Sequence, residues 1–167
     1  MKNIISILLS FLGGMAVDRV SLKKKHDEQL KYERLRGDKL QEFYELLLLW
    51  LELRQRNSSL KKYFDNKEYR NVAIYGMKEI GEALYRELNS IGIEIKYLID
   101  KDANSIYSDK DVYMPNDNLP DVDLIIVTAL HYYDEITSEL SVKVNCPIVN
   151  LTDVIYETLT LNIEKTV

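Results

Sequence analysis

The chain has 167 residues, a formal net charge of -5 and a pI near 5.2, and 46% of its residues are hydrophobic. This length accommodates one compact domain of ordinary size plus an extension, and the composition is that of a folded protein. The acidic balance argues against nucleic acid as the main partner, because phosphates in series need a basic face. The single cysteine, Cys146, excludes an internal disulfide and fits a reducing compartment.

The first predicted element is an apolar helix at the N-terminus. Residues 4–17 carry no charge. As a helix they rise about 21 Å, less than the roughly 30 Å hydrocarbon core, but residues 1–20 together nearly span it. We expect a membrane anchor over residues 1–20. The alternatives are a signal peptide cleaved near residues 14–16 and a helix buried in a protein interface.

Charges around this apolar run predict its orientation. Arg19, Lys23, Lys24 and Lys25 follow the run, whereas only Lys2 precedes it. By the positive-inside rule, the bulk of the chain then stays in the cytoplasm. The predicted location is therefore the cell membrane, crossed once, with the rest of the protein on the cytoplasmic side.

Residues 21–56 form a charged segment that is predicted to be helical. Its early part, 23–39, is polar almost all round, which indicates a solvated helix or spacer, interrupted at Gly37. Its later part, 40–53, carries two apolar stripes at helical spacing: Leu40, Tyr44, Leu47 and Leu51, and beside them Phe43, Leu46, Trp50 and Leu53. One stripe can cover the following domain, which leaves the other for a second copy or another protein. Alternatively, both stripes pack within one chain.

Residues 57–167 alternate between strand and helix patterns. A short helix carrying Leu60, Tyr63 and Phe64 is expected first, capped by the polar residues 57–59. The expected strands are 72–75, 93–99, 112–114, 124–128 and 147–151. The expected helices are 80–90, 132–142 and a last helix capped by Thr152 or Asp153. This alternation predicts an α/β domain with a Rossmann-like, five-stranded parallel sheet of order 3-2-1-4-5.

The turn after the first strand carries the strongest functional signal. In a dinucleotide-binding turn the first glycine, here Gly76, makes the tight bend, and the last, here Gly81, lets helix and strand pack closely. The following helix N-terminus binds phosphate. Asp100 ends the next strand, where an acid can hold a ribose diol; the alternative is an ordinary turn residue. Lys78 replaces the middle glycine, which obstructs the usual pose but brings an ammonium to the phosphate.

We therefore expect a nucleotide-type ligand, NAD(P) or a nucleotide sugar, in this crevice; another small anion, or a turn that has lost its ligand, are alternatives. The expected binding residues are Gly76, Met77, Lys78, Ile80, Gly81, Asp100, Lys101 and Thr128. His131 follows the fourth strand at the same sheet edge and is the candidate catalytic acid or base, or else a solvated loop residue. No spacing typical of a metal site is present in the sequence.

The sequence Ala-Ile-Tyr-Gly-Met-Lys-Glu-Ile-Gly at residues 73–81, with Tyr-Leu-Ile-Asp-Lys-Asp at 97–102, resembles small NAD(P)-binding-type Rossmann domains found with bacterial surface-polysaccharide enzymes. Examples are the N-terminal domains of sugar O-acyltransferases and relatives of nucleotide-sugar dehydratases and epimerases. The resemblance covers residues 71–156. It implies a nucleotide or nucleotide-sugar site over Gly76, Lys78, Ile80 and Asp100, with residues 128–131 across the crevice.

The sequence as a whole predicts a membrane-tethered, cytoplasmic nucleotide-binding module that is accessory to surface-polysaccharide synthesis. One alternative is a minimal NAD-dependent oxidoreductase or epimerase-like enzyme that uses His131 or a nearby tyrosine. Another is a non-binding adaptor that associates through helix 40–53. The Tyr63-x-x-x-Lys67 pattern matches the catalytic pair of short-chain dehydrogenases, but it precedes the glycine turn, and that position excludes the match.

Overall fold

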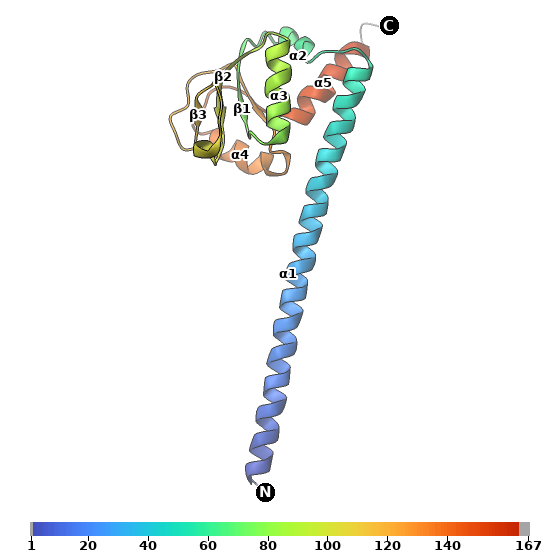
Figure 1. Cartoon of the computed structure of the whole chain (residues 1–167), viewed down its shortest axis with the longest axis vertical. Coiled ribbons are helices and arrows are strands. Elements are labelled where there is room, and N and C mark those ends of the chain that lie inside the picture. The colour runs from blue at the N-terminus through green and yellow to red at the C-terminus, as the bar shows by residue number, and fades with distance from the viewer. Residues whose placement is uncertain (1, 164–167) are drawn as a thin grey trace. The chain divides into compact units, whose positions relative to one another are not determined.

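The computed structural model describes the backbone of residues 2–163 and the side chains of residues 22–161. The chain divides into two compact units, residues 1–41 and 42–167. Helix α1 begins at Lys2 and ends at Gln55, so it supplies the first unit and opens the second (Figure 1). Gly37 lies inside this helix, and the expected interruption there is wrong. A single glycine costs a helix only about 1 kcal/mol, which good helix formers on both sides offset.

The described side chains of the first unit face solvent. Every side chain from residue 22 to residue 38 is exposed, as expected for a helix that is polar almost all round. Lys24 and Glu28 form an ion pair one turn apart. Within the part of the chain searched, no helix is long and apolar enough to cross a bilayer. The anchor expected over residues 1–20 falls on side chains outside the described ones and stays a prediction.

The second unit is built on a parallel sheet in the order β3-β2-β1-β4-β5, which confirms the predicted α/β class and strand order. Its five strands are β1 (Asn71–Tyr75), β2 (Glu94–Ile99), β3 (Val112–Tyr113), β4 (Leu124–Val127) and β5 (Ile148–Asn150). The strand order reverses between β1 and β4, where Tyr75 lies opposite Val127. In open parallel sheets, this reversal creates a crevice at the carboxyl ends of the strands.

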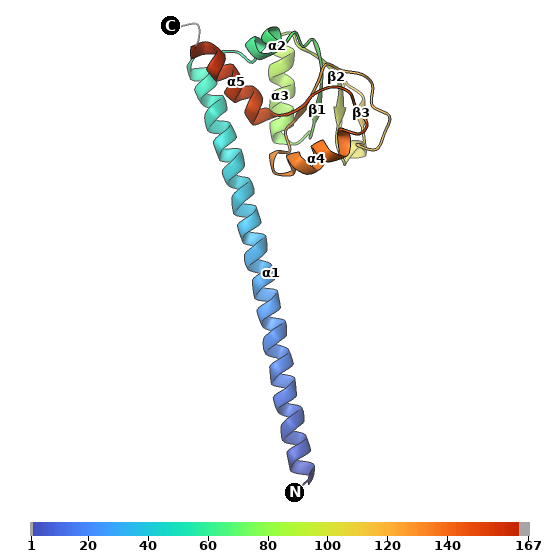
Figure 2. The ribbon, with the colours of Figure 1, turned by 180° about the vertical axis from the view of Figure 1, so that it is seen from behind.

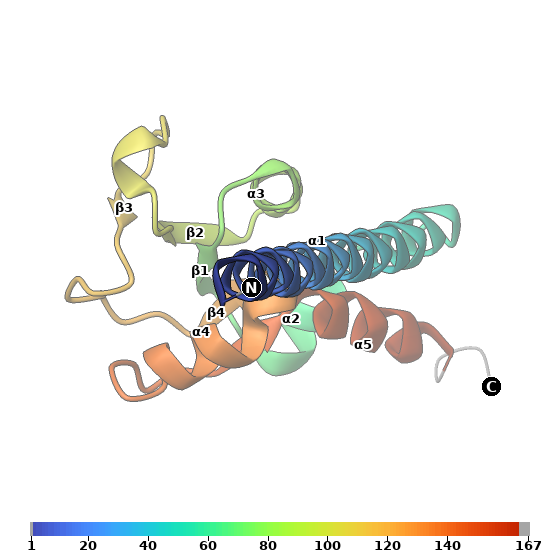
Figure 3. The ribbon, with the colours of Figure 1, turned by 90° about the horizontal axis from the view of Figure 1, so that it is seen from below.

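Helices cover both faces of the sheet. They are α2 (Lys61–Lys67), α3 (Glu79–Ser90), α4 (Tyr133–Leu140) and α5 (Leu151–Ile163). The last turns of α1 share one apolar core with α2, α3 and α5, whereas α4 packs on the other face. Figure 3 shows α3 and α4 on opposite sides of the strands. This division follows from right-handed crossovers that run in opposite directions from the middle of the sheet.

One of the two apolar stripes of α1 is buried and the other is exposed. Leu46, Trp50 and Leu53 are buried against the core of the second unit, and α5 lies beside these turns in both views (Figures 1 and 2). The other stripe is exposed, with side chains between 51% and 62% accessible at Leu40, Tyr44, Leu47 and Leu51. One stripe therefore covers the domain as predicted, and the alternative that both pack within the chain is wrong.

Because the buried stripe completes the core, the compact unit begins at residue 42, earlier than the expected start at residue 57. A polar contact reinforces the packing: Trp50 Nε1 donates a hydrogen bond to Glu87 Oε2 at 2.7 Å. Arg54 lies 3.5 Å from the other oxygen of the same carboxylate. The α/β fold thus includes the end of the long helix as one of its own layers.

The last helix begins differently from the prediction. It starts at Leu151, and Asn150 Oδ1 accepts a hydrogen bond from the backbone N–H of Thr152 at 2.9 Å. Asn150 therefore takes the capping role that was expected of Thr152 or Asp153. Asparagine is as good a cap as either residue, and here the end of β5 places it one step earlier.

Asp123 fixes the amino ends of β1 and β4 together. Its Oδ2 accepts hydrogen bonds from the backbone N–H of Arg70 at 2.7 Å and of Asn71 at 2.8 Å. These two hydrogen bonds hold the pKa of Asp123 below its usual value. The unfolded-state pKa of an aspartate is about 3.9. The stabilisation is therefore fully present above that pH and is lost as the pH falls through the lower folded-state pKa.

We predict that Asp123→Asn lowers the free energy of unfolding by about 1 kcal/mol at pH 7, after allowance for solvent screening. The loss should shrink toward pH 3, because protonation removes the same charge from the parent protein. Urea unfolding between pH 3 and 7 measures both effects, with Asp121→Asn in the exposed loop before β4 as the control. Equal losses at both ends of the pH range would contradict the assignment.

Candidate functional site

Gly76 makes the bend by which the chain leaves β1. Its φ is +93°, a conformation that side chains rarely allow. A Cβ placed here would lie 2.8 Å from Thr128 Oγ1. The position therefore requires glycine both for its backbone angle and for lack of space.

Gly81 lies in the first turn of α3, where the helix rests directly on the bend. A Cβ at this position would lie 1.9 Å from the carbonyl oxygen of Gly76. No side chain fits unless the helix moves away from the strand. The two glycines thus have the conformational roles that were predicted for them, a tight bend and close helix packing.

Thr128 directly follows β4 and is hydrogen-bonded to this turn. Its side chain is buried, and Oγ1 lies within hydrogen-bond distance of two carbonyl oxygens, Gly76 at 2.6 Å and Tyr75 at 3.1 Å. Its backbone N–H also donates to the Tyr75 carbonyl. Thr128 was predicted to contact the ligand, but its hydroxyl is occupied with holding the glycine turn.

Asp100 connects the end of β2 to the same turn. Its Oδ2 accepts a hydrogen bond from the Met77 N–H at 2.8 Å, and its Oδ1 accepts one from the Asp102 N–H at 2.9 Å. The residue therefore has the role of a turn residue in this structure. Each carboxylate oxygen can accept a second hydrogen bond, so a diol could still bind it.

The N-terminus of α3 offers backbone donors beside Asp100. Lys78 is the N-cap residue, its side chain is exposed and it makes no capping hydrogen bond. The first four N–H groups of any helix lack intrahelical acceptors and attract anions. Glu79 and Glu82 lie in this first turn and oppose an anion with their own charges.

The other predicted binding residues contribute in different ways. Ile80 and Met77 are half-buried and pack their side chains against the main apolar core. Lys101 is exposed and pairs with Glu135 of α4 at 3.1 Å. Its ammonium therefore reaches the helix on the opposite face of the sheet from α3.

His131, the predicted acid or base, is held by a residue that the sequence did not indicate. Its Nδ1 lies 3.2 Å from Glu42 Oε1 on α1. Its ring packs edge-on against Tyr132 at 5.4 Å between ring centres. Because the carboxylate fixes the ring through Nδ1, Nε2 is left for another group. Glu42 lies 89 residues from His131 in sequence, and no local pattern could have paired them.

Tyr75 is a second polar group that sequence reasoning missed. It ends β1, its side chain is 3% exposed, and among the described residues its hydroxyl has no hydrogen-bond partner. Burial, followed by the charges of Glu139, Asp100 and Glu135, raises the pKa of Tyr75 to about 12. The hydroxyl is therefore a protonated donor near the carboxyl edge. In the sequence, the indication of such a group is a tyrosine, with its polar hydroxyl, at the end of a strand that is otherwise apolar.

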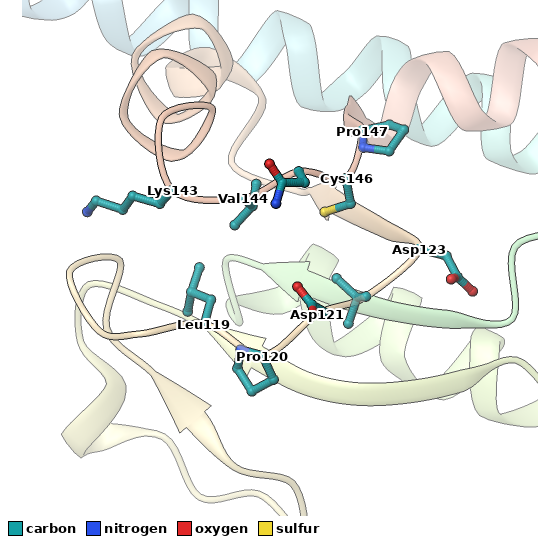
Figure 4. Close-up of a pocket in the computed structure, with 10 residues that line it drawn as sticks. Leu119, Pro120, Asp121, Asp123, Lys143, Val144, Cys146 and Pro147 are labelled. Atoms are coloured by element: carbon teal, nitrogen blue, oxygen red, sulfur yellow. The ribbon is translucent and has the colours of Figure 1, made fainter.

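A cavity of about 320 Å³ lies at the opposite, amino edge of the sheet. Two loops line it, residues 119–123 before β4 and residues 143–147 before β5 (Figure 4). Lys143 donates to the Pro115 carbonyl and to Asn116 Oδ1. Burial raises the pKa of the Cys146 thiol, which disfavours the reactive thiolate. The cavity is thus separate from the predicted site, and none of the predicted binding residues lines it.

Comparison with known proteins gives one likeness. Residues 68–147, just under half of the chain, match the family model described as C2185-like, N-terminal. The matched stretch runs from just before β1 to just before β5, so it contains the glycine turn, Asp100, Thr128 and His131. Searches of curated proteins and of solved structures returned no match.

We predict that Gly81→Ala destabilises the protein by about 2–3 kcal/mol, because its Cβ collides with the Gly76 carbonyl. The matched control is Gly37→Ala in α1, where a Cβ has no atom within 4 Å. That substitution should stabilise the helix by up to about 1 kcal/mol. Urea unfolding followed by circular dichroism measures both. Equal effects at the two glycines would contradict the close packing at Gly81.

Proposed function

We propose that the second unit is a Rossmann-like module that binds a nucleotide-type ligand, NAD(P) or a nucleotide sugar. The proposal rests on three features that lie together at the carboxyl end of β1: a glycine bend, a helix N-terminus and an aspartate. A bend that only glycine can make leads there into an α-helix, and the Met77 N–H just before that helix donates to Asp100 at the end of β2. Open parallel sheets bind ligands at such a point of strand reversal.

The residues suggest how such a ligand would lie. A phosphate would accept hydrogen bonds from the first-turn amides of α3, and the Lys78 ammonium would meet it as a point charge. A ribose would donate its hydroxyls to Asp100, in competition with the Met77 N–H. Glu79 and Glu82 weaken the attraction for a multiply charged phosphate. We therefore expect modest affinity, typical of a module that responds to ligand concentration.

The resemblance of residues 71–156 to domains found with bacterial surface-polysaccharide enzymes supports an accessory role in that synthesis. An anchor at residues 1–20 would keep the module at the cytoplasmic face of the membrane, where lipid-linked sugars are assembled. Both parts of the proposal rest on sequence, and the fold is compatible with them.

A specific contact favours a second candidate, a small oxidoreductase or epimerase-like enzyme. Glu42 orients the His131 imidazole at the same sheet edge as the glycine turn. A carboxylate that fixes one ring nitrogen leaves the other for proton transfer. Turnover that is lost in His131→Ala while ligand binding persists would favour the enzyme. Bound ligand without turnover would favour the module.

We predict that millimolar NAD(H) or UDP-glucose raises the melting temperature of the full chain by a few degrees, through preferential binding to the folded state. Lys78→Ala and Asp100→Asn should each reduce this shift relative to their own ligand-free baselines. Asp121→Asn at the opposite sheet edge is the matched control. If a broad nucleotide panel produces no shift, the binding proposal fails in favour of a non-binding adaptor.

We predict that the full chain sediments with membranes and that deletion of residues 1–17 moves it to the soluble fraction. Removal of the apolar run leaves too little hydrophobic surface for insertion. Ultracentrifugation followed by immunoblotting measures the distribution, with a carbonate wash to remove peripheral proteins. A truncated chain that still pellets with washed membranes would contradict the anchor.

A further inference from the structure

The exposed large apolar residues of α1 in the second unit are Tyr44, Leu47, Leu48 and Leu51, which we call the outer stripe. We propose that the outer stripe is the interface of a parallel, two-fold dimer of this chain. This inference is independent of the nucleotide site, since none of the four residues lies at the glycine turn.

The outer stripe is an apolar patch that remains exposed among the residues that the structure describes. The exposed fractions are 62% for Tyr44, 51% for Leu47, 46% for Leu48 and 53% for Leu51. Of the other apolar residues of these turns, Leu46, Trp50 and Leu53 are buried in the same chain, and Phe43 and Leu49 are half-buried against the same core. Soluble monomers rarely expose a contiguous apolar patch larger than a few hundred Å². The helix therefore carries more apolar surface than its own domain uses.

The spacing of the outer stripe indicates that its partner is another helix. Tyr44, Leu47 and Leu51 are separated by three and then four residues, the alternation of a coiled-coil seam. Leu40 lies four residues earlier and is also exposed. Side chains at this spacing interdigitate with an identical row from another helix.

A second copy is the occupant that matches this seam. It supplies an apolar row of the same length and spacing, and an isologous contact uses the same patch on both chains. The outer stripe contains no charged side chain, so two copies can face each other without burying a charge. The only polar side-chain group in the outer stripe is the Tyr44 hydroxyl, which can remain in contact with water at the edge of the interface.

The position of the domain selects the parallel orientation. The buried face of α1 lies about one-third of a turn from the outer stripe, because each residue advances the helix by about 100°. A parallel two-fold pair places the two α/β domains on opposite sides of the seam. An antiparallel pair places both domains on the same side. The parallel pair therefore separates the two domains more widely, because Leu46, Trp50 and Leu53 occupy the same turns as the stripe.

The small size of the outer stripe predicts a weak dimer. Each of its side chains has roughly half of its surface still to bury. The contact therefore falls below the roughly 1,200–2,000 Å² of a stable interface. We expect dissociation constants on the order of 10–100 μM and rapid exchange between monomer and dimer.

Disulfide trapping tests the interface on the full chain in a Cys146→Ser background. In a parallel pair identical residues meet, so Leu47→Cys and Leu51→Cys should each give covalent dimers with themselves. Glu45→Cys and Glu52→Cys, on the same helix but outside the stripe, are the matched controls and should stay monomeric. Trapping that is equal at all four positions would overturn the proposal. So would trapping only in a mixture of Leu47→Cys and Tyr44→Cys chains, which indicates antiparallel pairing.

Sedimentation equilibrium provides a second readout on the full chain in mild detergent. The combined Leu47→Glu and Leu51→Glu variant should raise the dimer dissociation constant at least tenfold. Val142→Glu, which changes an apolar residue that is 84% exposed in a loop, should leave it unchanged. Circular dichroism verifies that the variants stay folded. A full chain that remains monomeric at 200 μM, or a dimer unaffected by the two glutamates, would overturn the proposal.

Discussion

The fit of α3 onto the end of β1 is the constraint on which the rest of this domain depends. The first turn of the helix rests on the Gly76 carbonyl so closely that Gly81 has no space for a methyl group. Thr128 closes the contact from β4, and Asp100 closes it from β2. Three neighbouring strands are therefore joined at one point. Any ligand that binds there meets a turn whose geometry already exists before binding, which lowers the entropic cost of association.

The charges around that point limit what the site can bind. The free amides of α3 and Lys78 attract an anion, whereas Glu79 and Glu82 in the same turn repel it. Asp100 brings a further negative charge that suits hydroxyl groups better than phosphate oxygens. For the nucleotide-type ligand that we propose, this balance would favour one or two phosphates with a diol over a free polyphosphate.

The long helix takes part in the domain as well as extending from it. One face of α1 completes the core through Leu46 and Leu53, while Trp50 is bound to Glu87 of α3. The same turns expose the outer stripe, and Glu42 holds His131 near the carboxyl edge. A change in the packing of α1 against another copy would therefore act close to the predicted site. The buried face of α1, the proposed dimer interface and the contact with the candidate acid or base lie within a few helical turns.

The amino-acid sequence by itself determined the features that depend on local pattern. Alternating apolar runs specified the strands and their parallel order, and Gly76 and Gly81 specified the shape of the turn. The two apolar stripes over residues 40–53 indicated that a face of α1 is buried, and the structure decided that it is the face with Leu46, Trp50 and Leu53. Each of these signals arises from residues within a few positions of one another, where helical or strand periodicity dictates geometry.

Only the tertiary structure decided how polar groups are paired. Glu42 and His131 lie 89 residues apart, and Trp50 and Glu87 lie 37 apart. No periodicity connects them until the helices have packed. The structure likewise assigned Thr128 to the glycine turn and left the Tyr75 hydroxyl buried, with no hydrogen-bond partner among the residues that the structure describes. Hydrogen bonds of this kind depend on side-chain positions to within a few tenths of an ångström, which chain order does not specify.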